Sequence, residues 1–272
     1  MRLCVLQTRL PFVLICLALA ACGGLREEVA AIGLAAPPAP VVAEKPSPDA
    51  ALAQAQAADA QGDMEEAERL YVIAAEGGNI DARIALGVMY LAGRGVHKDY
   101  AAAVHWLEPA AKAGNAEAQV RLGLIYENGG VGVTASPDKA MEWYTRAADQ
   151  GLANAQYRAG SLMLQAILGH ENPARALQYF QAAAAQGHVQ AATAIGMLLL
   201  QGRAGRQDIP GALTWLRRGA ERGDPEAMLQ LGRLYWEGER VPKNIPEGTR
   251  LLRQAAALGS EEARHELALP PI

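Results

Sequence analysis

The stretch that determines the fold lies at residues 82–114, where the chain reads ARIALGVMYLAGRGVHKDYAAAVHWLEPAAKAG. It consists of two alanine-rich segments, a loop that contains Gly93 and Gly95, and a closing glycine, Gly114. Asp99 stands just before the second segment, where its carboxylate can accept hydrogen bonds from the free N–H groups of a first helical turn. A closing glycine suits the left-handed position that often follows a helix. The stretch therefore predicts one pair of antiparallel helices.

The same pattern recurs with a period of about 36 residues, which is typical of a repeat array. A glycine inside the first helix of each unit stands at Gly87, Gly123, Gly160, Gly196 and Gly232. A second glycine closes the units at Gly78, Gly114, Gly151, Gly187, Gly223 and Gly259. A residue that can cap the second helix stands at Asp63, Asp99, Ser136, Asn172, Asp208 and Asn244. The agreement of three independent series indicates a chain of stacked helix pairs.

The interior glycines predict close helix packing. Glycine inside a helix costs about 1 kcal/mol relative to alanine, so its repeated use implies backbones too close for a Cβ atom. The small residues expected to form the opposing surface are Ala67, Ala103, Ala140, Ala176, Ala212 and Gly248. Large residues occupy alternate positions at Tyr90, Trp106, Tyr126, Trp143, Tyr179, Trp215 and Tyr235. These observations predict an all-α fold, a right-handed α-solenoid of antiparallel helix pairs.

The N-terminus resembles the signal peptide of a bacterial lipoprotein. Arg2 and Arg9 form a positive segment, and residues 11–21 form an apolar stretch too short to span about 30 Å of hydrocarbon. The stretch ends in Leu-Ala-Ala before Cys22, like the lipobox, whose cysteine thiol is lipidated before the peptide is cut. The resemblance implies a signal peptide at residues 1–21 and a lipid anchor on Cys22. An ordinary secretory signal that happens to precede a cysteine is the alternative.

Residues 22–49 are predicted to be the lipidated cysteine and a semi-rigid extended tether, because several prolines there lock φ and remove backbone donors. Gly23 follows the cysteine. In enteric lipoproteins an aspartate at that position retains the protein at the inner membrane, so the resemblance favours the outer membrane, facing the periplasm. The chain is therefore expected in the cell envelope.

Residues 82–114 resemble a complete Sel-one-like repeat, a relative of the tetratricopeptide repeat. The matching residues are Ala82, Leu86, Gly87, Tyr90, Gly93, Gly95, Val96, Asp99, Ala103, Trp106, Ala110, Ala111 and Gly114. The resemblance implies five such units over residues 82–262, of which the third departs most, with Ala159 and Met163 at the leucine and tyrosine positions. Residues 50–81 have the shorter turn of a tetratricopeptide-like unit. Residues 260–272 are predicted to be a capping helix and tail, which a solenoid requires.

The charge and the cysteine count exclude several classes of protein. The pI is near 5.8 and the net charge is −4, and removal of residues 1–21 would leave about −6. A general nucleic-acid binder needs a basic face, so none is predicted. The three cysteines are Cys4, Cys16 and Cys22, so a chain cut before Cys22 keeps one. One cysteine can form neither an internal disulfide nor a cysteine-based zinc site.

The sequence contains no motif typical of catalysis, metal binding or cofactor binding. The five histidines are spread over different units with no metal-ligand spacing. The loops at Gly93 and Gly129 follow no predicted strand and lack the lysine of a phosphate-binding loop. We therefore predict no enzyme, no metal site and no cofactor.

By resemblance to tetratricopeptide repeats, the first helices are expected to line a concave groove that binds a protein or peptide. The groove positions are Asp81, Ile84, Val88, Leu91, Glu117, Val120, Leu124, Glu127, Asn154, Tyr157, Ser161, Leu164, Gln190, Thr193, Met197, Leu200, Glu226, Leu229, Arg233 and Trp236. The foremost candidates for partner binding are Ile84, Val88, Leu91, Val120, Glu127, Tyr157, Met197, Arg233 and Trp236. An apolar floor with an acidic edge suits an apolar peptide with basic flanks. The alternative is that several of these residues only pack between units.

Trp236 is expected to point into the groove and its neighbour Tyr235 into the core, because adjacent helix positions differ by about 100° in direction. The predicted function is a membrane-anchored extracytoplasmic scaffold or adaptor, with components of an envelope complex among its possible partners. Alternatives are a scaffold for envelope assembly or exopolysaccharide export, and a surface-exposed host-interaction factor. Cysteine-rich relatives imply a β-lactam-interacting enzyme as well. Those relatives carry disulfides in every unit, however, and this chain has none.

Overall fold

The computed structural model describes residues 45–165 and 171–268. Within these ranges the chain forms thirteen α-helices and no strand, apart from one isolated bridge between Gly130 and Val133. The helices are α3 (Pro48–Gln61), α4 (Met64–Glu76), α5 (Ile80–Ala92), α6 (Tyr100–Lys112), α7 (Ala116–Asn128), α8 (Pro137–Asp149), α9 (Ala153–Met163), α10 (Pro173–Ala185), α11 (Val189–Gln201), α12 (Ile209–Glu221), α13 (Pro225–Glu237), α14 (Ile245–Ala257) and α15 (Glu261–Ala268). The predicted signal peptide, Cys22 and residues 23–44 of the tether lie outside the described residues.

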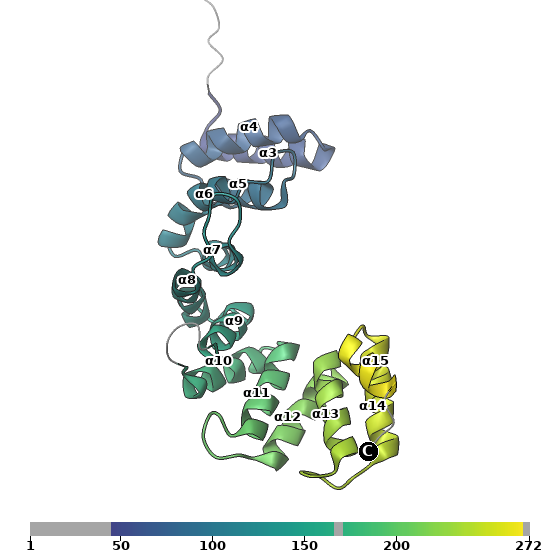
Figure 1. Cartoon of the computed structure of the whole chain (residues 1–272). Coiled ribbons are helices and arrows are strands. Elements are labelled where there is room, and N and C mark those ends of the chain that lie inside the picture. The colour runs from purple at the N-terminus through teal and green to yellow at the C-terminus, as the bar shows by residue number, and fades with distance from the viewer. Residues whose placement is uncertain (1–44, 166–170, 269–272) are drawn as a thin grey trace, which may run out of the picture. The chain divides into compact units, whose positions relative to one another are not determined.

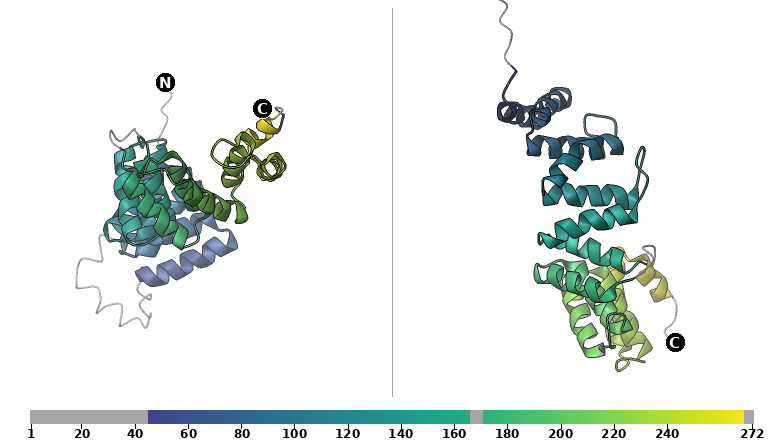
Figure 2. Two further views of the ribbon diagram at one scale, coloured as in Figure 1. Left: turned by 90° about the horizontal axis from the view of Figure 1, so that it is seen from below. Right: turned by 90° about the vertical axis from the view of Figure 1, so that its left-hand side faces the viewer.

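Each helix packs against the next along the chain (Figures 1 and 2). The first helices of the units are α3, α5, α7, α9, α11 and α13. Each packs against the second helix of its unit, which is α4, α6, α8, α10, α12 or α14, respectively. The predicted all-α solenoid of antiparallel helix pairs is confirmed. In the described part of the chain, no helix combines the length and the apolar character needed to cross a bilayer.

The six predicted caps all hold the second helices at their first turn. The side chains of Asp63, Asp99, Ser136, Asn172, Asp208 and Asn244 each accept at least one hydrogen bond from a backbone N–H of that turn. Each such bond satisfies a donor that the helix itself leaves unpaired. The closing glycines also behave as predicted, with φ between 87° and 98° at all six positions. The loop chemistry thus fixes where each helix starts and stops.

The interior glycines receive a bulky side chain from the second helix of their own unit. A Cβ atom on Gly160 would lie 2.8 Å from Cε1 of Phe180, and one on Gly123 would lie 2.5 Å from Cε1 of Tyr144. The residues that fill these sites across the five units are Leu107, Tyr144, Phe180, Leu216 and Leu252. The expected close contact is therefore confirmed, and the bulky side chain is a partner that was not predicted. The small residues also oppose the glycines, as at Gly196, where an added Cβ would lie 3.2 Å from the carbonyl oxygen of Ala212. The alanines lie one turn earlier on the second helix, where they are fully buried.

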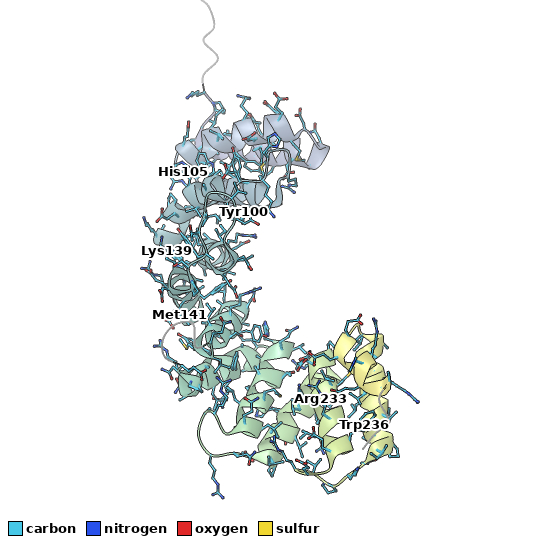
Figure 3. All side chains as sticks on the ribbon, viewed as in Figure 1. Tyr100, His105, Lys139, Met141, Arg233 and Trp236 are labelled. Atoms are coloured by element: carbon cyan, nitrogen blue, oxygen red, sulfur yellow. The ribbon has the colours of Figure 1, made fainter. Side chains whose placement is uncertain are left out.

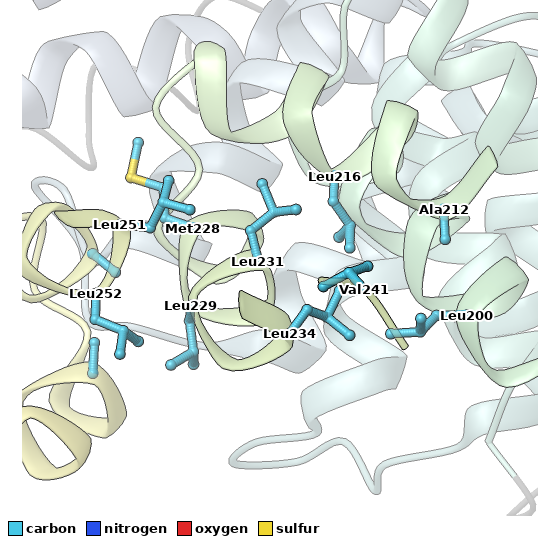
Figure 4. Packing of buried hydrophobic residues seen from close by; sticks show 12 residues of the cluster. Leu200, Ala212, Leu216, Met228, Leu229, Leu231, Leu234, Val241, Leu251 and Leu252 are labelled. Atoms are coloured by element: carbon cyan, nitrogen blue, oxygen red, sulfur yellow. The ribbon is translucent and has the colours of Figure 1, made fainter. Parts of the chain in front are cut away.

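The apolar interior is divided into five clusters rather than gathered in one core. Figure 4 shows the cluster at the C-terminal end, where Leu216 of α12, Leu231 of α13 and Leu252 of α14 pack in one layer. Each first helix therefore buries one side against its own second helix and another against a neighbouring unit. Such a chain of thin layers is expected for a repeat array, in which each unit contacts only its neighbours.

Buried glutamines form polar links between neighbouring units, which the sequence analysis did not anticipate. Gln119 donates to the carbonyl of Ala111 at 3.0 Å and accepts from Gln150 at 2.8 Å. One unit later Gln156 and Gln186 repeat the same arrangement, with the carbonyl of Ala148 as acceptor. Gln119 is 3 % and Gln156 7 % exposed, so these amides would be costly to leave without partners.

The two ends of the array differ from the repeats between them. Helix α3 begins at Pro48, with Ser47 as its cap, so the predicted tether boundary at residue 49 lies slightly too late. Proline is tolerated at this first helical position because the N–H that it lacks would be unpaired there. The short turn between α3 and α4, at residues 62–63, is observed as predicted. At the other end, α15 forms the predicted capping helix.

Substitution of Gly160 with leucine should lower the free energy of unfolding by about 1–3 kcal/mol or more, because the new side chain would overlap the buried ring of Phe180. Thermal unfolding followed by circular dichroism measures the change. Gln178→Leu is the matched control, since it adds leucine at an exposed position of the adjacent α10 and should change stability by less than about 0.5 kcal/mol. Equal melting temperatures for the two variants would contradict the packing role of the glycine.

Candidate interaction surface

The predicted groove residues occupy the first helices, but none of the foremost candidates is freely exposed. The half-buried residues are Ile84, Val88, Leu91, Val120, Glu127, Tyr157, Met197, Arg233 and Trp236. Their partners within the chain decide which of them remain available to another molecule. They fall into three sets, according to their position on the helix.

The first set packs against the following unit. It contains Ile84, Val120 and Tyr157, and its last two members, Thr193 and Leu229, are only 4 % and 1 % exposed. The assignment of Thr193 and Leu229 to the groove was therefore wrong. Consecutive units approach each other along this line of each first helix, and the side chains there fill the interface between units. The alternative interpretation, packing between units, holds for these two residues.

Tyr157 illustrates this inter-unit role. Its ring stacks on the ring of His188, with the centroids 4.5 Å apart, and lies 5.8 Å from the ring of Phe180. Burial lowers the pKa of His188, and the nearby charge of Arg158 lowers it further, so the imidazole is kept neutral against the tyrosine. Tyr157 thus joins α9 to α10 and to the turn before α11.

The second set points toward the second helix of its own unit. Leu200 is 5 % exposed, and Trp236 lies so close to α14 that a Cβ on Gly248 would be 2.4 Å from its Cδ1. The indole N–H of Trp236 donates to the hydroxyl of Thr249 at 3.2 Å. Tyr235 instead points toward α12, where its hydroxyl accepts a hydrogen bond from Arg217 at 3.0 Å. The prediction that Trp236 points into the groove was therefore wrong, because Trp236 is held inside its own helix pair. Tyr235 also packs against the buried cluster at this end of the array.

Glu127 belongs to the same set and is committed to internal hydrogen bonds. Its carboxylate accepts from the hydroxyl of Tyr144 at 2.7 Å and from Arg158 at 2.9 Å. Burial and the adjacent carboxylate raise the pKa of Tyr144, so the phenol stays protonated and remains a donor. The three residues come from α7, α8 and α9, which makes Glu127 a link between units rather than a free acidic contact.

The third set is Val88, Leu124, Ser161, Met197 and Arg233, of which Leu124 is exposed and the others are half-buried. Arg233 differs from the other four, because it forms ion pairs with Glu262, at 2.9 Å, and with Glu266. Both acidic residues lie on α15, so Arg233 links α13 to the capping helix. Arg233 is labelled in Figure 3. The remaining four, Val88, Leu124, Ser161 and Met197, are named here the first-helix stripe.

The first-helix stripe is bordered by exposed polar residues. These are Asp81, Glu117, Asn154, Gln190 and Glu226, at one equivalent position of each unit. Leu124 is 38 % exposed, more than most large apolar side chains of the described residues. An apolar line with an acidic and amide border is therefore present, although it is narrower than the predicted groove.

A second surface, formed by the second helices, was missed from the sequence. Helices α4, α6 and α8 carry eight acidic and four basic side chains, whereas α10, α12 and α14 carry two acidic and five basic ones. On α12 the basic side chains are Arg217 and Arg218, and Arg222 follows at the C-cap. These three arginines are named here the arginine ridge. A helix-by-helix count of charge would have revealed it, because the total of −4 hides the uneven distribution.

Furrows flank the arginine ridge on both sides. One, of about 470 Å³, lies between α10 and α12 and is lined by His188, Trp215 and Arg222 among others. The other, of about 490 Å³, lies between α12 and α14, with Met228 and Leu231 as apolar floor. Across residues 45–165 and 171–268, no three His, Cys, Asp or Glu side chains are grouped so that they could hold a metal ion.

The model of the family described as "Sel1 repeat" matches residues 51–79, 80–115, 116–152, 153–188, 189–224 and 225–260. The chain belongs to the Sel1 repeat family. Six repeats are recognised where five were predicted, because residues 51–79, expected to be a tetratricopeptide-like unit, match as well. Its short turn changes the loop of the repeat but keeps the helix pair. Sel1 repeat chains form helical scaffolds that commonly bind other proteins, and the fold is not typically enzymatic.

Two solved structures support this assignment. The first is a protective antigen present in uropathogenic Escherichia coli strains, with 29% identity and a TM-score of 0.71 over 81% of this chain. The chain spans about half, 48%, of the length of that antigen. The second is a Sel1 repeat protein from Oxalobacter formigenes, with 28% identity and a TM-score of 0.67, covering 79% of this chain and 88% of that one. A comparison with curated proteins gives no match.

Substitution of Trp236 with alanine should lower the free energy of unfolding by about 1–3 kcal/mol, less than the cost for a fully buried ring, because the side chain is half-buried against α14. Leu124→Ala is the control, since it removes a more exposed apolar side chain and should cost less than about 1 kcal/mol. The measurement is thermal or urea unfolding followed by circular dichroism. A Trp236→Ala variant as stable as the wild type would show that the indole is not a packing element.

Proposed function

We propose that this Sel1 repeat chain is a lipid-anchored scaffold of the cell envelope that binds a protein partner along its first-helix stripe. The observation that carries the proposal is the line of Val88, Leu124 and Met197, in which Leu124 is 38 % exposed and the other two side chains are half-buried. A soluble surface rarely keeps aligned apolar side chains without a use. The acidic and amide border favours a partner segment with apolar contacts and basic flanks.

The anchor is proposed from the lipobox-like sequence that ends at Cys22, and the outer membrane, facing the periplasm, from Gly23. Acyl chains stabilise membrane binding by about 0.8 kcal/mol per buried CH₂, so several chains hold a protein on a bilayer almost permanently. The scaffold would then act at the membrane surface, with residues 23–47 between the lipid and the first helix. Partners from an envelope complex fit this placement.

A surface-exposed variant of this function is favoured by one comparison. The E. coli relative, at 29% identity, is described as a protective antigen of uropathogenic strains. If this chain also faces outward, protease added to intact cells would degrade it. Resistance of the chain in intact cells, with degradation after the outer membrane is opened, would support the periplasmic placement instead.

The anchor is tested by growing cells with a clickable fatty-acid analogue. The wild-type chain should become labelled, and Cys22→Ala should abolish the label because the acceptor thiol is gone. Cys16→Ala is the matched control, since it removes a cysteine of the same segment and should leave labelling unchanged. Label that persists on the Cys22→Ala chain would show that no lipid is attached there.

The stripe is tested by crosslinking in envelope membranes, followed by recovery of the chain. Combined Val88→Ser, Leu124→Ser and Met197→Ser substitutions should reduce the recovered partner by about tenfold, as expected when apolar anchors of an interface are removed. The matched control is Ile80→Ser, Val131→Ser and Leu258→Ser, which removes three exposed apolar side chains outside the stripe. Equal recovery with both variants would remove the stripe from consideration.

A further inference from the structure

We propose that the arginine ridge on α12 and its two furrows bind an acidic segment of a protein, independently of the first-helix stripe. The two surfaces lie on different helices, the stripe on first helices of the units and the ridge at α12. Arg233 and Tyr235 are two positions apart on α13 and therefore point about 200° apart. Arg233 occupies the position on α13 that is equivalent to the stripe residues of the earlier first helices, whereas Tyr235 lines the furrow between α12 and α14. The binding surfaces share no residue.

Neutral groups hold each arginine of the ridge in place. Arg217 donates to the hydroxyl of Tyr235 at 3.0 Å, and Arg222 donates to the carbonyl of Gly187 at 3.2 Å. The guanidinium of Arg218 lies 4.7 Å from the centre of the Trp215 ring. Among the described residues none of the three forms an ion pair, although all are exposed. The positive charges are positioned without being neutralised, which leaves them available to carboxylates of another molecule.

Three other arginines on the second helices are neutralised locally, whereas Arg175 on α10 is held by the hydroxyl and ring of Tyr179. Arg69 pairs with Glu66 and Arg146 with Glu142, each at 2.6 Å. The same holds for Arg250, which pairs with Glu247 on α14. Against this background, the ridge is a local excess of positive charge on a chain whose net charge is −4. Charge complementarity therefore favours an acidic ligand at this site.

The furrows indicate that the ligand also has apolar side chains. Between α12 and α14 the floor is formed by Met228, Leu231 and Leu251. The rim carries Arg217 together with Glu221 and the Arg250–Glu247 ion pair, so Arg217 is the cation of this rim without an ion pair among the described residues. Between α10 and α12, Trp215 and His188 line a hollow beside Arg218 and Arg222. A peptide in which carboxylates alternate with apolar side chains satisfies both features. A polyphosphate backbone would leave the apolar floors unused.

The test uses the full-length chain in detergent and two short fluorescein-labelled peptides of equal length, one repeating Glu-Glu-Leu and one repeating Lys-Lys-Leu. Fluorescence anisotropy should show binding of the acidic peptide and at least about tenfold weaker binding of the basic one. Higher salt should weaken the binding, because exposed charges are screened within about 8 Å at physiological ionic strength. A peptide repeating Gln-Gln-Leu should bind as weakly as the basic one.

The ridge is removed by Arg217→Gln, Arg218→Gln and Arg222→Gln together, which should weaken binding of the acidic peptide by about tenfold or more. The control is Arg69→Gln, Lys112→Gln and Arg146→Gln, which removes three positive charges from α4, α6 and α8 and should change the affinity less than about twofold. Equal losses in both variants would overturn the proposal, since only overall charge would matter. Should the ridge variant fail to fold, the three peptides and the salt series on the wild-type chain decide.

Two further outcomes would replace the acidic segment with another ligand. Binding to phosphatidylglycerol vesicles without binding to the acidic peptide would assign the ridge to a membrane surface. Dimerisation in analytical ultracentrifugation that the ridge variant abolishes, again without peptide binding, would assign it to a second copy of the chain. Loss of partner crosslinking on substitution of the first-helix stripe is independent of these results, so the two proposals can fail separately.

Discussion

The close contact between each interior glycine and a bulky side chain of the second helix determines the geometry of every unit. At Gly87 and Gly196 the side chain is a leucine, and at Gly123 and Gly160 it is aromatic. The space left by the missing Cβ of the glycine forms a socket for that side chain. The glycine lowers the intrinsic stability of its helix by about 1 kcal/mol, but the socket allows the bulky side chain to be deeply buried. The two helices can then approach closely enough for a unit of about 36 residues to bury an interior with few aromatic side chains.

Because the helices pack this closely, little of the surface of each helix remains exposed to solvent. A first helix must contact its own second helix, the preceding unit and the following unit, and these contacts occupy most of its circumference. Tyr157 and Glu127 show the result, because each joins elements of two units while being only half-buried. Stability in such an array resides in interfaces between neighbours. The buried glutamine pairs add directional bonds to these interfaces, and one unit later a hydrogen bond between Thr193 and Asp224 takes their place. There Gly219 stands where other units have alanine, since a Cβ would lie 2.6 Å from the hydroxyl of Thr193.

The local features of the fold could be predicted from the sequence because each depends on one residue and its own backbone. A cap such as Asn172 or a closing glycine such as Gly187 works in any helix pair, and both were found as expected. Side-chain direction was harder to predict, since it depends on how each unit is rotated against the next. Adjacent positions differ by about 100°, so a small rotational error assigned Trp236 to the groove although it packs against α14. The bulky partner of the interior glycines was missed for the same reason. The small residue and the bulky one lie one turn apart on the second helix, and the structure shows that the bulky side chain fills the socket.

The distribution of charge follows from the different packing of the first and second helices. Positions on the first helices are constrained by packing on several sides, whereas the outer positions of the second helices are free to vary without disturbing the sockets. Charge can therefore accumulate there at small structural cost, and it does so with opposite sign in the two halves of the described chain. Ion pairs within single helices consume much of it, as with Arg69 and Arg146, but on α12 the arginines are held by a phenol, a carbonyl and an indole ring. Neutral partners fix the position of a guanidinium group without neutralising its positive charge. This arrangement favours recognition of a carboxylate on another molecule over further stabilisation of the fold.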